Sequence, residues 1–246
     1  MPSPFVGKTV LITGANRGLG LGFASSLVAA GARVVACCRD PDKAERLAAI
    51  SPKPLIVQLD VASQDSVNEL RSRLEVVGVS GLDYLINNAG ISSPNHPNDP
   101  ILEADPAVIR SVFDVNVIGT ILVTHACMPL LKAAPTRTVV NISSQLASME
   151  GCLGVQGRFG GVCSYRLSRA ANNMAMRCFA GELLDQGYIF AAMSPGHVAT
   201  DMGTAGGRKA PLTVEQSVIG MLKVIGHLAP ADNGKFLQHD WAELPW

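Results

Sequence analysis

The chain has 246 residues, of which 48% are hydrophobic and 16% charged, and its formal net charge at pH 7 is zero. This length and composition suit one folded domain with a large core and exclude intrinsic disorder. The balanced charge, without a basic tail or an acidic run, argues against nucleic acid as the main partner.

In chain order, we expect strands and helices to alternate throughout. The predicted order is a strand at 9–12, a helix at 21–30, a strand at 33–38, a helix at 42–50, a strand at 54–59, a helix at 63–77, a strand at 84–87, a helix at 105–128, a strand at 138–142, a helix at 164–185, a strand at 188–193, a helix at 213–228 and a strand at 234–238. Ser63 and Asp105 are the expected N-caps, with Pro106 in the first turn. Apolar strands that alternate with helices predict an α/β fold, a single-domain doubly wound parallel sheet with helices on both faces.

Two segments break this regularity. Residues 92–100 are rich in Pro, Asn and Ser and are predicted to form a surface loop. Residues 151–162 contain five glycines and are predicted to form a mobile loop that gates a pocket. Ligands of such sheets bind beyond the carboxyl ends of the strands, so the segments that follow the strands hold the candidate functional residues.

The sequence also predicts the compartment and excludes some ligands. We expect no signal peptide and no apolar segment long enough to span a bilayer, hence a soluble, cytoplasmic protein that does not bind membranes. The six cysteines form no paired C-x-x-C pattern and are expected to be free thiols. The five histidines lack metal-ligand spacing, so no metal is expected.

Three glycines after the first predicted strand indicate a phosphate-binding turn. Gly14, Gly18 and Gly20 are spaced G-x-x-x-G-x-G between a strand and a helix. Glycine allows a sharp turn and a close approach to a ligand, and the helix N-terminus then favours phosphate or pyrophosphate. The spacing alone also fits an ordinary glycine-rich turn, but its place near the N-terminus favours a dinucleotide site.

The motifs that follow the later strands add to this pattern. They are Asp60-Val61, Asn87-Asn88-Ala89-Gly90, Asn141-Ile142-Ser143-Ser144, Tyr165-Arg166-Leu167-Ser168-Arg169 and Pro195-Gly196-His197-Val198-Ala199-Thr200. In this order they resemble the short-chain dehydrogenase/reductase family, over nearly the whole chain. The segments 195–202 and 237–246 look most like its C-factor-like carbonyl reductase branch. The resemblance implies one Rossmann-fold domain over 1–246, with a dinucleotide-binding part to about 145, a substrate-side part over about 146–246, and a homodimer or homotetramer.

The resemblance also implies a set of cofactor-binding residues. These are Gly14, Asn16, Arg17, Gly18, Leu19, Gly20, Arg39, Asp60, Val61, Asn87, Ala89, Gly90, Tyr165, Arg169, Pro195, Gly196, Val198 and Thr200. Cys38 occupies the strand end where NAD enzymes need an acidic side chain, and the guanidinium of Arg39 suits a 2′-phosphate. We therefore expect NADPH/NADP rather than NADH, with Arg17 as a second cation. Alternatively, Arg17 and Arg39 are solvated charges and Asp40 pairs with Arg39.

The implied catalytic residues are Asn116, which would hold a water chain, Ser144, Tyr165 and Arg169, with Ser143 as the fallback serine. A carbonyl that accepts a hydride becomes an alkoxide, so it needs a proton donor and hydrogen bonds. A phenol has a pKa near ~10, which a neighbouring cation lowers. Arg169 lies four residues after Tyr165 and thus on the same helix face. The family usually has lysine there, and arginine is not its isostere.

These residues predict an oxidoreductase that uses NADPH to reduce the carbonyl of an aldehyde or ketone, a small-molecule substrate, with Tyr165 as proton donor. Two alternatives remain because of Arg169. The protein either binds the cofactor for non-redox chemistry, or keeps the fold as a signalling or interaction protein. His197 either lines the nicotinamide edge or is a plain loop residue.

Overall fold

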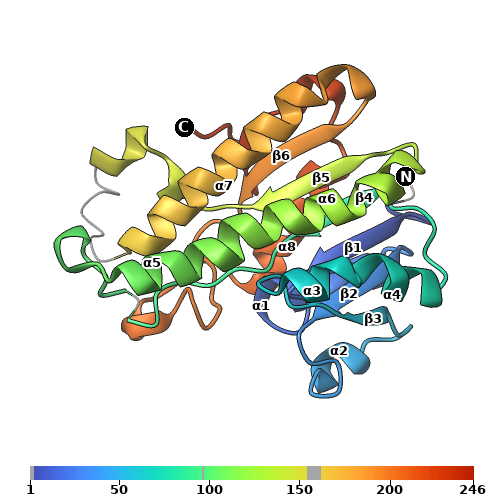
Figure 1. Cartoon of the computed structure of the whole chain (residues 1–246), viewed down its shortest axis with the longest axis horizontal. Coiled ribbons are helices and arrows are strands. Elements are labelled where there is room, and N and C mark those ends of the chain that lie inside the picture. Colours follow the sequence, from blue (N-terminus) through green and yellow to red (C-terminus); the bar gives the residue numbers. More distant parts are fainter. Residues whose placement is uncertain (1–2, 96, 154–161) are drawn as a thin grey trace.

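The computed structural model describes residues 3–95, 97–153 and 162–246, and it contains one parallel sheet of seven strands (Figure 1). The strand order is β3-β2-β1-β4-β5-β6-β7. The strands are β1 (Thr9–Thr13), β2 (Arg33–Cys38), β3 (Leu55–Gln58), β4 (Tyr84–Asn87), β5 (Thr138–Ile142), β6 (Ile189–Ser194) and β7 (Phe236–Gln238). All neighbours are parallel, which confirms the predicted doubly wound α/β sheet.

The helices cover both faces of the sheet. They are α1 (Gly18–Ala29), α2 (Glu45–Ala48), α3 (Gln64–Asn68), α4 (Leu70–Val76), α5 (Pro106–Phe113), α6 (Gly119–Lys132), α7 (Cys163–Glu182) and α8 (Val214–Ile225). The predicted helix over 42–50 is shorter in the structure, and the one over 63–77 is two helices. The caps follow local chemistry as expected, because Ser63 accepts the N–H of Ser66 and Asp105 accepts the N–H of Ala107.

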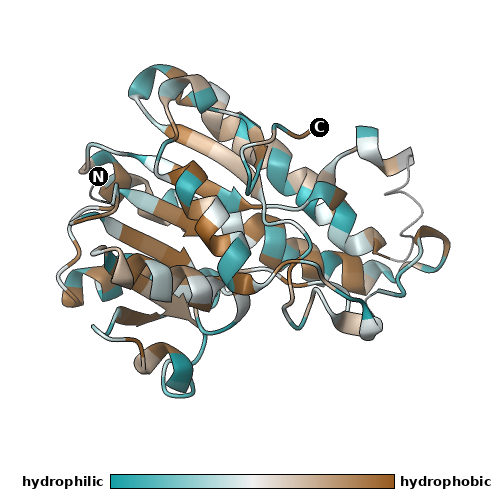
Figure 2. Cartoon of the chain, turned by 180° about the vertical axis from the view of Figure 1, so that it is seen from behind, coloured by the Kyte–Doolittle hydropathy of each residue, from teal (hydrophilic) through white to brown (hydrophobic). Residues whose placement is uncertain are grey.

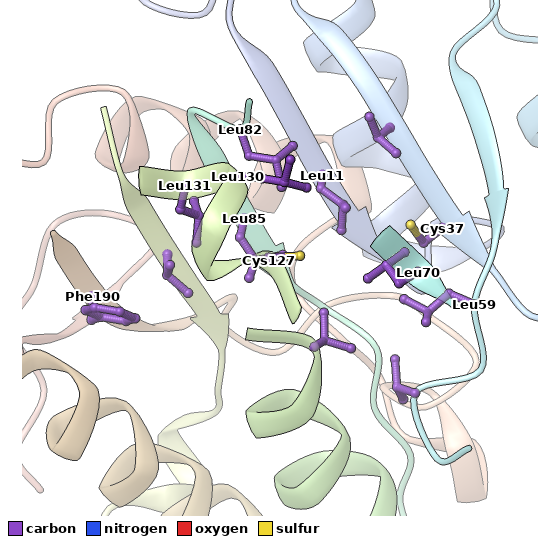
Figure 3. Close-up of a cluster of buried hydrophobic side chains, with 14 of the residues drawn as sticks. Leu11, Cys37, Leu59, Leu70, Leu82, Leu85, Cys127, Leu130, Leu131 and Phe190 are labelled. Atoms are coloured by element: carbon purple, nitrogen blue, oxygen red, sulfur yellow. The ribbon is translucent and has the colours of Figure 1, made fainter. Parts of the chain in front are cut away.

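Alternate strand residues build two separate cores. One core joins the strands to α3, α4, α6 and α7, and Figure 3 shows part of it around Leu11, Cys37 and Leu85. The other core joins the strands to α1, α2 and α8. Figure 2 shows the hydrophobic strands between these layers. Adjacent residues of β2 divide between the cores, with Cys37 in the first and Cys38 in the second, because successive side chains point to opposite faces.

The helix predicted over 105–128 is longer and less regular than expected. A π-helical segment, η2 (Asp114–Ile118), connects α5 to α6, so one continuous helical rod extends from Pro106 to Lys132. Contrary to expectation, Pro106–Lys132 is long and apolar enough, by length and composition, to cross a bilayer. A core helix of a soluble protein passes the same test, and this rod packs against β4, β5 and α7 (Figure 1).

The direction in which strands are added reverses between β1 and β4. Sheets of this kind bind ligands at such a switch point, beyond the carboxyl ends of the strands. The loops after β1, β4, β5 and β6 therefore meet where the candidate residues lie. The predicted gating loop over 151–162 falls largely outside the described residues, since 154–161 are not described.

Candidate active site

A cavity of about 1670 Å³ opens at the carboxyl edge of the sheet. Its walls come from the segments after β1 to β6, from the first turns of α1 and from α7. The expected residues that line it are Gly14, Asn16, Arg17, Gly18, Leu19, Arg39, Asp60, Val61, Ala89, Gly90, Ser144, Tyr165, Arg169, Pro195, Gly196, Val198 and Thr200. Three expected residues, Gly20, Asn87 and Asn116, do not line the cavity but support residues that do.

The glycine turn is held against the end of β4. Gly14 has φ 65°, a left-handed conformation that favours glycine. A Cβ on Gly20 would overlap the Gly14 carbonyl oxygen and the Asn88 side chain, so Gly20 permits close packing rather than ligand contact. The Asn88 side-chain amide donates to the carbonyls of Thr13 and Gly14 at 2.8 and 3.1 Å. Asn88 lines the cavity and was not among the expected site residues, although it lies within the Asn87–Gly90 motif.

Arg17 lies in the glycine turn and reaches across the cavity mouth. Its Nη1 is 2.9 Å from the Asp201 carboxylate, in the segment after β6, and both side chains are largely exposed. Arg17 thus bridges two cavity walls. An exposed pair of this kind contributes little stability, so its guanidinium is available to an anion at little cost.

Several cations gather where β2 ends. Arg39, Lys43 and Arg46 line the cavity there, beside the buried thiol of Cys38. Asp40 pairs with Lys43 at 2.7 Å and not with Arg39, which corrects the expected alternative. The hydrogen bond from Lys43 lowers the pKa of Asp40, so this carboxylate stays ionised and its charge is balanced by the Lys43 ammonium. Arg39 makes no ion pair with any residue that the structure describes, so its charge faces the cavity uncompensated.

Burial raises the pKa of the Cys38 thiol, against an opposing hydrogen bond from the backbone at Asp40. Cys38 therefore remains a neutral thiol at physiological pH. It cannot accept hydrogen bonds from a ribose as a carboxylate does. The last residue of β2 therefore offers no ionised acceptor, and the nearby carboxylate of Asp40 is paired with Lys43.

Asn87 and Asn116 are buried supports. The Asn87 amide donates to Thr124 Oγ1 at 3.0 Å and to Asn141 Oδ1 at 2.9 Å, which ties β4 to α6 and β5. Asn116 stands in the π-helical segment η2, where its side chain bonds both the N–H and the C=O of Ile91. The π-helical segment thus fixes the chain after β4, where Ile91 lines the cavity.

The two serines after β5 have different surroundings. Ser143 also belongs to the cavity lining, but it is almost fully buried and its hydroxyl donates to Asn173 Oδ1 at 2.6 Å. Ser144 is half-buried and lines the cavity, and its Oγ accepts the N–H of Leu146 at 3.2 Å. The Tyr165 side chain faces the same cavity, and its hydroxyl bonds no residue in the described part of the chain. Ser144, rather than Ser143, is free to act together with Tyr165.

Arg169 is buried against Tyr165. Its guanidinium carbon lies 5.0 Å from the centre of the Tyr165 ring, and its Nη1 donates to the Ile142 carbonyl at 2.9 Å. Its Nη2 occupies the space that a Cβ on Gly90 would fill, and its Nε has no partner. No carboxylate in the described residues pairs with this guanidinium. A buried cation without a counterion favours negative charge in the adjoining cavity.

The segment after β6 forms the remaining wall. Val198 is buried, and the methyl group of Thr200 lies 3.5 Å from where a Cβ on Gly18 would stand. The cavity-lining His197 bonds the Gly203 carbonyl at 2.8 Å, so it braces this loop. Arg208 and Lys209 also line the cavity.

The cavity fits an anionic dinucleotide. Its described lining holds seven basic residues, Arg17, Arg39, Lys43, Arg46, Arg169, Arg208 and Lys209, against three acidic ones, Asp40, Asp60 and Asp201. This excess stands out because the whole chain has no net charge. A phosphorylated dinucleotide requires three features that this cavity has. They are a glycine turn at the N-terminus of α1, an arginine without an ion-pair partner among the described residues at the end of β2, and the buried positive charge of Arg169.

The chain is similar in sequence and architecture to known proteins. The model of the short chain dehydrogenase family matches residues 8–210. The NADPH-bound carbonyl reductase from chicken fatty liver is 34% identical, with a TM-score of 0.89 over 100% of this chain and 96% of that one. The carbonyl reductase Sniffer of D. melanogaster is 31% identical, with a TM-score of 0.86 over 98% of this chain and 100% of that one. The C-signal protein of Myxococcus xanthus is 36% identical over 67% of this chain and 93% of its own length. With the glycine turn, the Ser144–Tyr165 pair and the seven-stranded sheet in place, the chain belongs to the short-chain dehydrogenase/reductase family of oxidoreductases.

Proposed function

We propose that this oxidoreductase uses NADPH to reduce the carbonyl group of small or medium-sized aldehydes or ketones. The observation that carries the proposal is the placement of Ser144 and Tyr165 on one cavity with the glycine turn. The similarity to NADPH-bound and other carbonyl reductases supports it. When bound, the nicotinamide supplies the hydride.

In this proposal Tyr165 donates the proton that the developing alkoxide requires. Ser144 holds the carbonyl oxygen by a second hydrogen bond, which strengthens as negative charge develops. The buried charge of Arg169 beside the Tyr165 ring stabilises the phenolate that remains. Arg169 cannot itself release a proton, so Tyr165 regains its proton from another group or from solvent.

The preference for NADPH rests on the end of β2. Arg39 offers a planar fork of donors for a 2′-phosphate, while Cys38 offers no ionised acceptor for a 2′-hydroxyl. Lys43 neutralises Asp40, so the neighbouring carboxylate repels a phosphate less. These contacts support NADPH as the main cofactor and NADH as a poorer one.

The test is the oxidation of NADPH with a panel of aliphatic and aromatic aldehydes and ketones. Wild-type protein is expected to consume NADPH with at least one carbonyl compound. Tyr165→Phe is expected to abolish turnover while NADPH binding, measured by calorimetry, stays near the wild-type value. Equal turnover by wild type and Tyr165→Phe would overturn the role of Tyr165 as proton donor.

The alternative is a cofactor-binding protein with non-redox chemistry. The specific observation in its favour is Arg169, whose Nη1 is engaged by the Ile142 carbonyl and whose side chain is wedged between Gly90 and Tyr165. Tight NADPH binding by a wild type that is inert on the whole panel would favour this alternative. The expected homodimer or homotetramer stays a prediction, which sedimentation velocity measures.

A further inference from the structure

Helix α7 is fastened to the end of β5 by hydrogen bonds from consecutive residues. Asn141 Nδ2 donates to Asn172 Oδ1 at 3.0 Å, and Ser143 Oγ donates to Asn173 Oδ1 at 2.6 Å. Between them, the Ile142 carbonyl accepts Arg169 Nη1 at 2.9 Å. Every side chain in this set that makes a bond is almost wholly buried.

These bonds come directly before Ser144 in the chain. On α7, Tyr165, Arg169, Asn172 and Asn173 share one helix face, because they are spaced i, i+4, i+7 and i+8. The same face therefore presents Tyr165 to the cavity and the two asparagines to β5. A shift of α7 along its axis, or a rotation about it, would break these bonds together.

Asparagine is a costly choice at these positions. The side-chain carbonyls of Asn172 and Asn173 accept hydrogen bonds from Asn141 and Ser143, and the side-chain Nδ2 of each asparagine has no partner in the described part of the chain. A buried unpaired donor destabilises a protein, and apolar residues would pack a helix on a sheet without that penalty. Hydrogen bonds are directional where apolar contacts are not, so the polar residues define a register that packing alone would leave looser.

The hydrogen-bond network that joins α7 to β5 continues to α6. Asn141 also accepts the Asn87 amide, which reaches Thr124 on α6. The chain of side chains Thr124, Asn87, Asn141 and Asn172 thus crosses from α6 through β4 and β5 to α7. Its α7 end lies next to the reactive pair, whereas its α6 end, Thr124, makes its side-chain hydrogen bonds to Asn87 and Thr120 and not to α7.

We propose that Asn172 and Asn173 are positioning residues that set the register between Tyr165 and Ser144 through their bonds to β5. This proposal rests on the proposed carbonyl reduction for its kinetic consequence, but not for its geometry. Misplacing a reacting group by about 1 Å costs on the order of 100-fold in rate. The asparagines touch no reacting atom, so their loss should alter the chemical step and not cofactor binding.

The experiment distinguishes an effect on the register of α7 from an effect on stability. It removes first one and then both members of the Asn141–Asn172 hydrogen bond. Asn172→Leu leaves Asn141 with an unpaired buried donor and should lower both the melting temperature and kcat. The double variant Asn141→Leu/Asn172→Leu removes both polar groups and should regain much of the melting temperature. Its kcat should stay about 10- to 100-fold below wild type while the NADPH Kd remains near wild type. Asn173→Ala tests the second bond in the same way.

Thr124→Val is the matched control, because it breaks the α6 end of the same network and leaves α7 untouched. It should reduce the melting temperature with little change in kcat. A crystal structure of the double variant gives a readout that does not depend on turnover, since it measures the separation of Ser144 and Tyr165. If wild type reduces no carbonyl compound, the proposed function fails and this separation still tests the register. A double variant with wild-type kcat, or with an unchanged separation of Ser144 and Tyr165, would overturn the proposal.

Discussion

The guanidinium carbon of Arg169 lies 5.0 Å from the centre of the Tyr165 ring, and both side chains line the active-site cavity. Arg169→Ala removes this cation and should lower kcat for carbonyl reduction by about 100-fold or more. Arg169→Lys keeps the positive charge and should retain more rate than the alanine variant, since a compact ammonium also fits beside the ring. Steady-state kinetics on the best substrate of the panel compares the variants.

Arg177→Ala is the control for Arg169. Arg177 also lies on α7 over an aromatic ring, with its guanidinium carbon 5.4 Å from the Trp246 ring centre, but it does not line the cavity. It should leave kcat nearly unchanged. A large gain in rate for Arg169→Lys over wild type would mean that the native arginine damps the redox reaction.

Arg39→Ala should weaken NADPH far more than NADH. The lost contact is a charge-assisted hydrogen bond to the 2′-phosphate, worth about 1.5–3 kcal/mol, and NADH lacks that phosphate. Titration calorimetry with both cofactors measures the effect. Arg71→Ala, at an exposed side chain of α4 that pairs with Glu75, controls for a general loss of positive charge. Equal losses for the two cofactors would contradict the assignment of Arg39.

Gly20→Ala should abolish NADPH binding. Its Cβ would overlap the Gly14 carbonyl oxygen and the Cα of Ala15, both backbone atoms, so the glycine turn itself must move. Gly181→Ala is the matched control because nothing lies within 4 Å of its Cβ position and it stands in α7. There the substitution should stabilise the protein by about 0.5–1 kcal/mol. Thermal unfolding and NADPH titration together distinguish the two glycines.

Asp83 should make stability sensitive to acid. Burial raises its pKa, but hydrogen bonds from Thr136, the Thr9 N–H and Lys8 outweigh burial and hold the pKa of Asp83 below its ordinary value of 3.8. A lowered carboxyl pKa adds stability that is complete above 3.8 and is lost as the pH falls through the folded-state value.

Asp83→Asn should therefore reduce the free energy of unfolding by about 2 kcal/mol at neutral pH. Denaturant titrations at a series of pH values measure the difference from wild type, which should shrink below the ordinary carboxyl pKa. Asp185→Asn, an exposed carboxylate after α7, serves as the control. A difference that stays constant into strong acid would show that Asp83 acts by packing and not by charge.

Much of the fold could be predicted from the chain because the signals are local. β2, β4 and β5 begin and end where the apolar runs do, and Ser63 and Asp105 cap their helices through short-range hydrogen bonds. The glycine turn could be predicted from residue spacing and its place after the first strand, since the left-handed backbone conformation at Gly14 favours glycine. Helix ends were less predictable, because final turns depend on what they pack against.

The amino-acid sequence by itself determined the parallel α/β sheet, the turn after β1 and the residue types after each strand, because periodicity and glycine spacing act within a few residues. Only the tertiary structure decided that Lys43, not Arg39, pairs with Asp40, that Asn87 and Asn116 face protein rather than the cavity, and that Asn172 and Asn173 clamp α7 to β5. These are contacts between side chains on different segments. Their geometry is set by how the strands and helices pack, which no local pattern in the chain encodes.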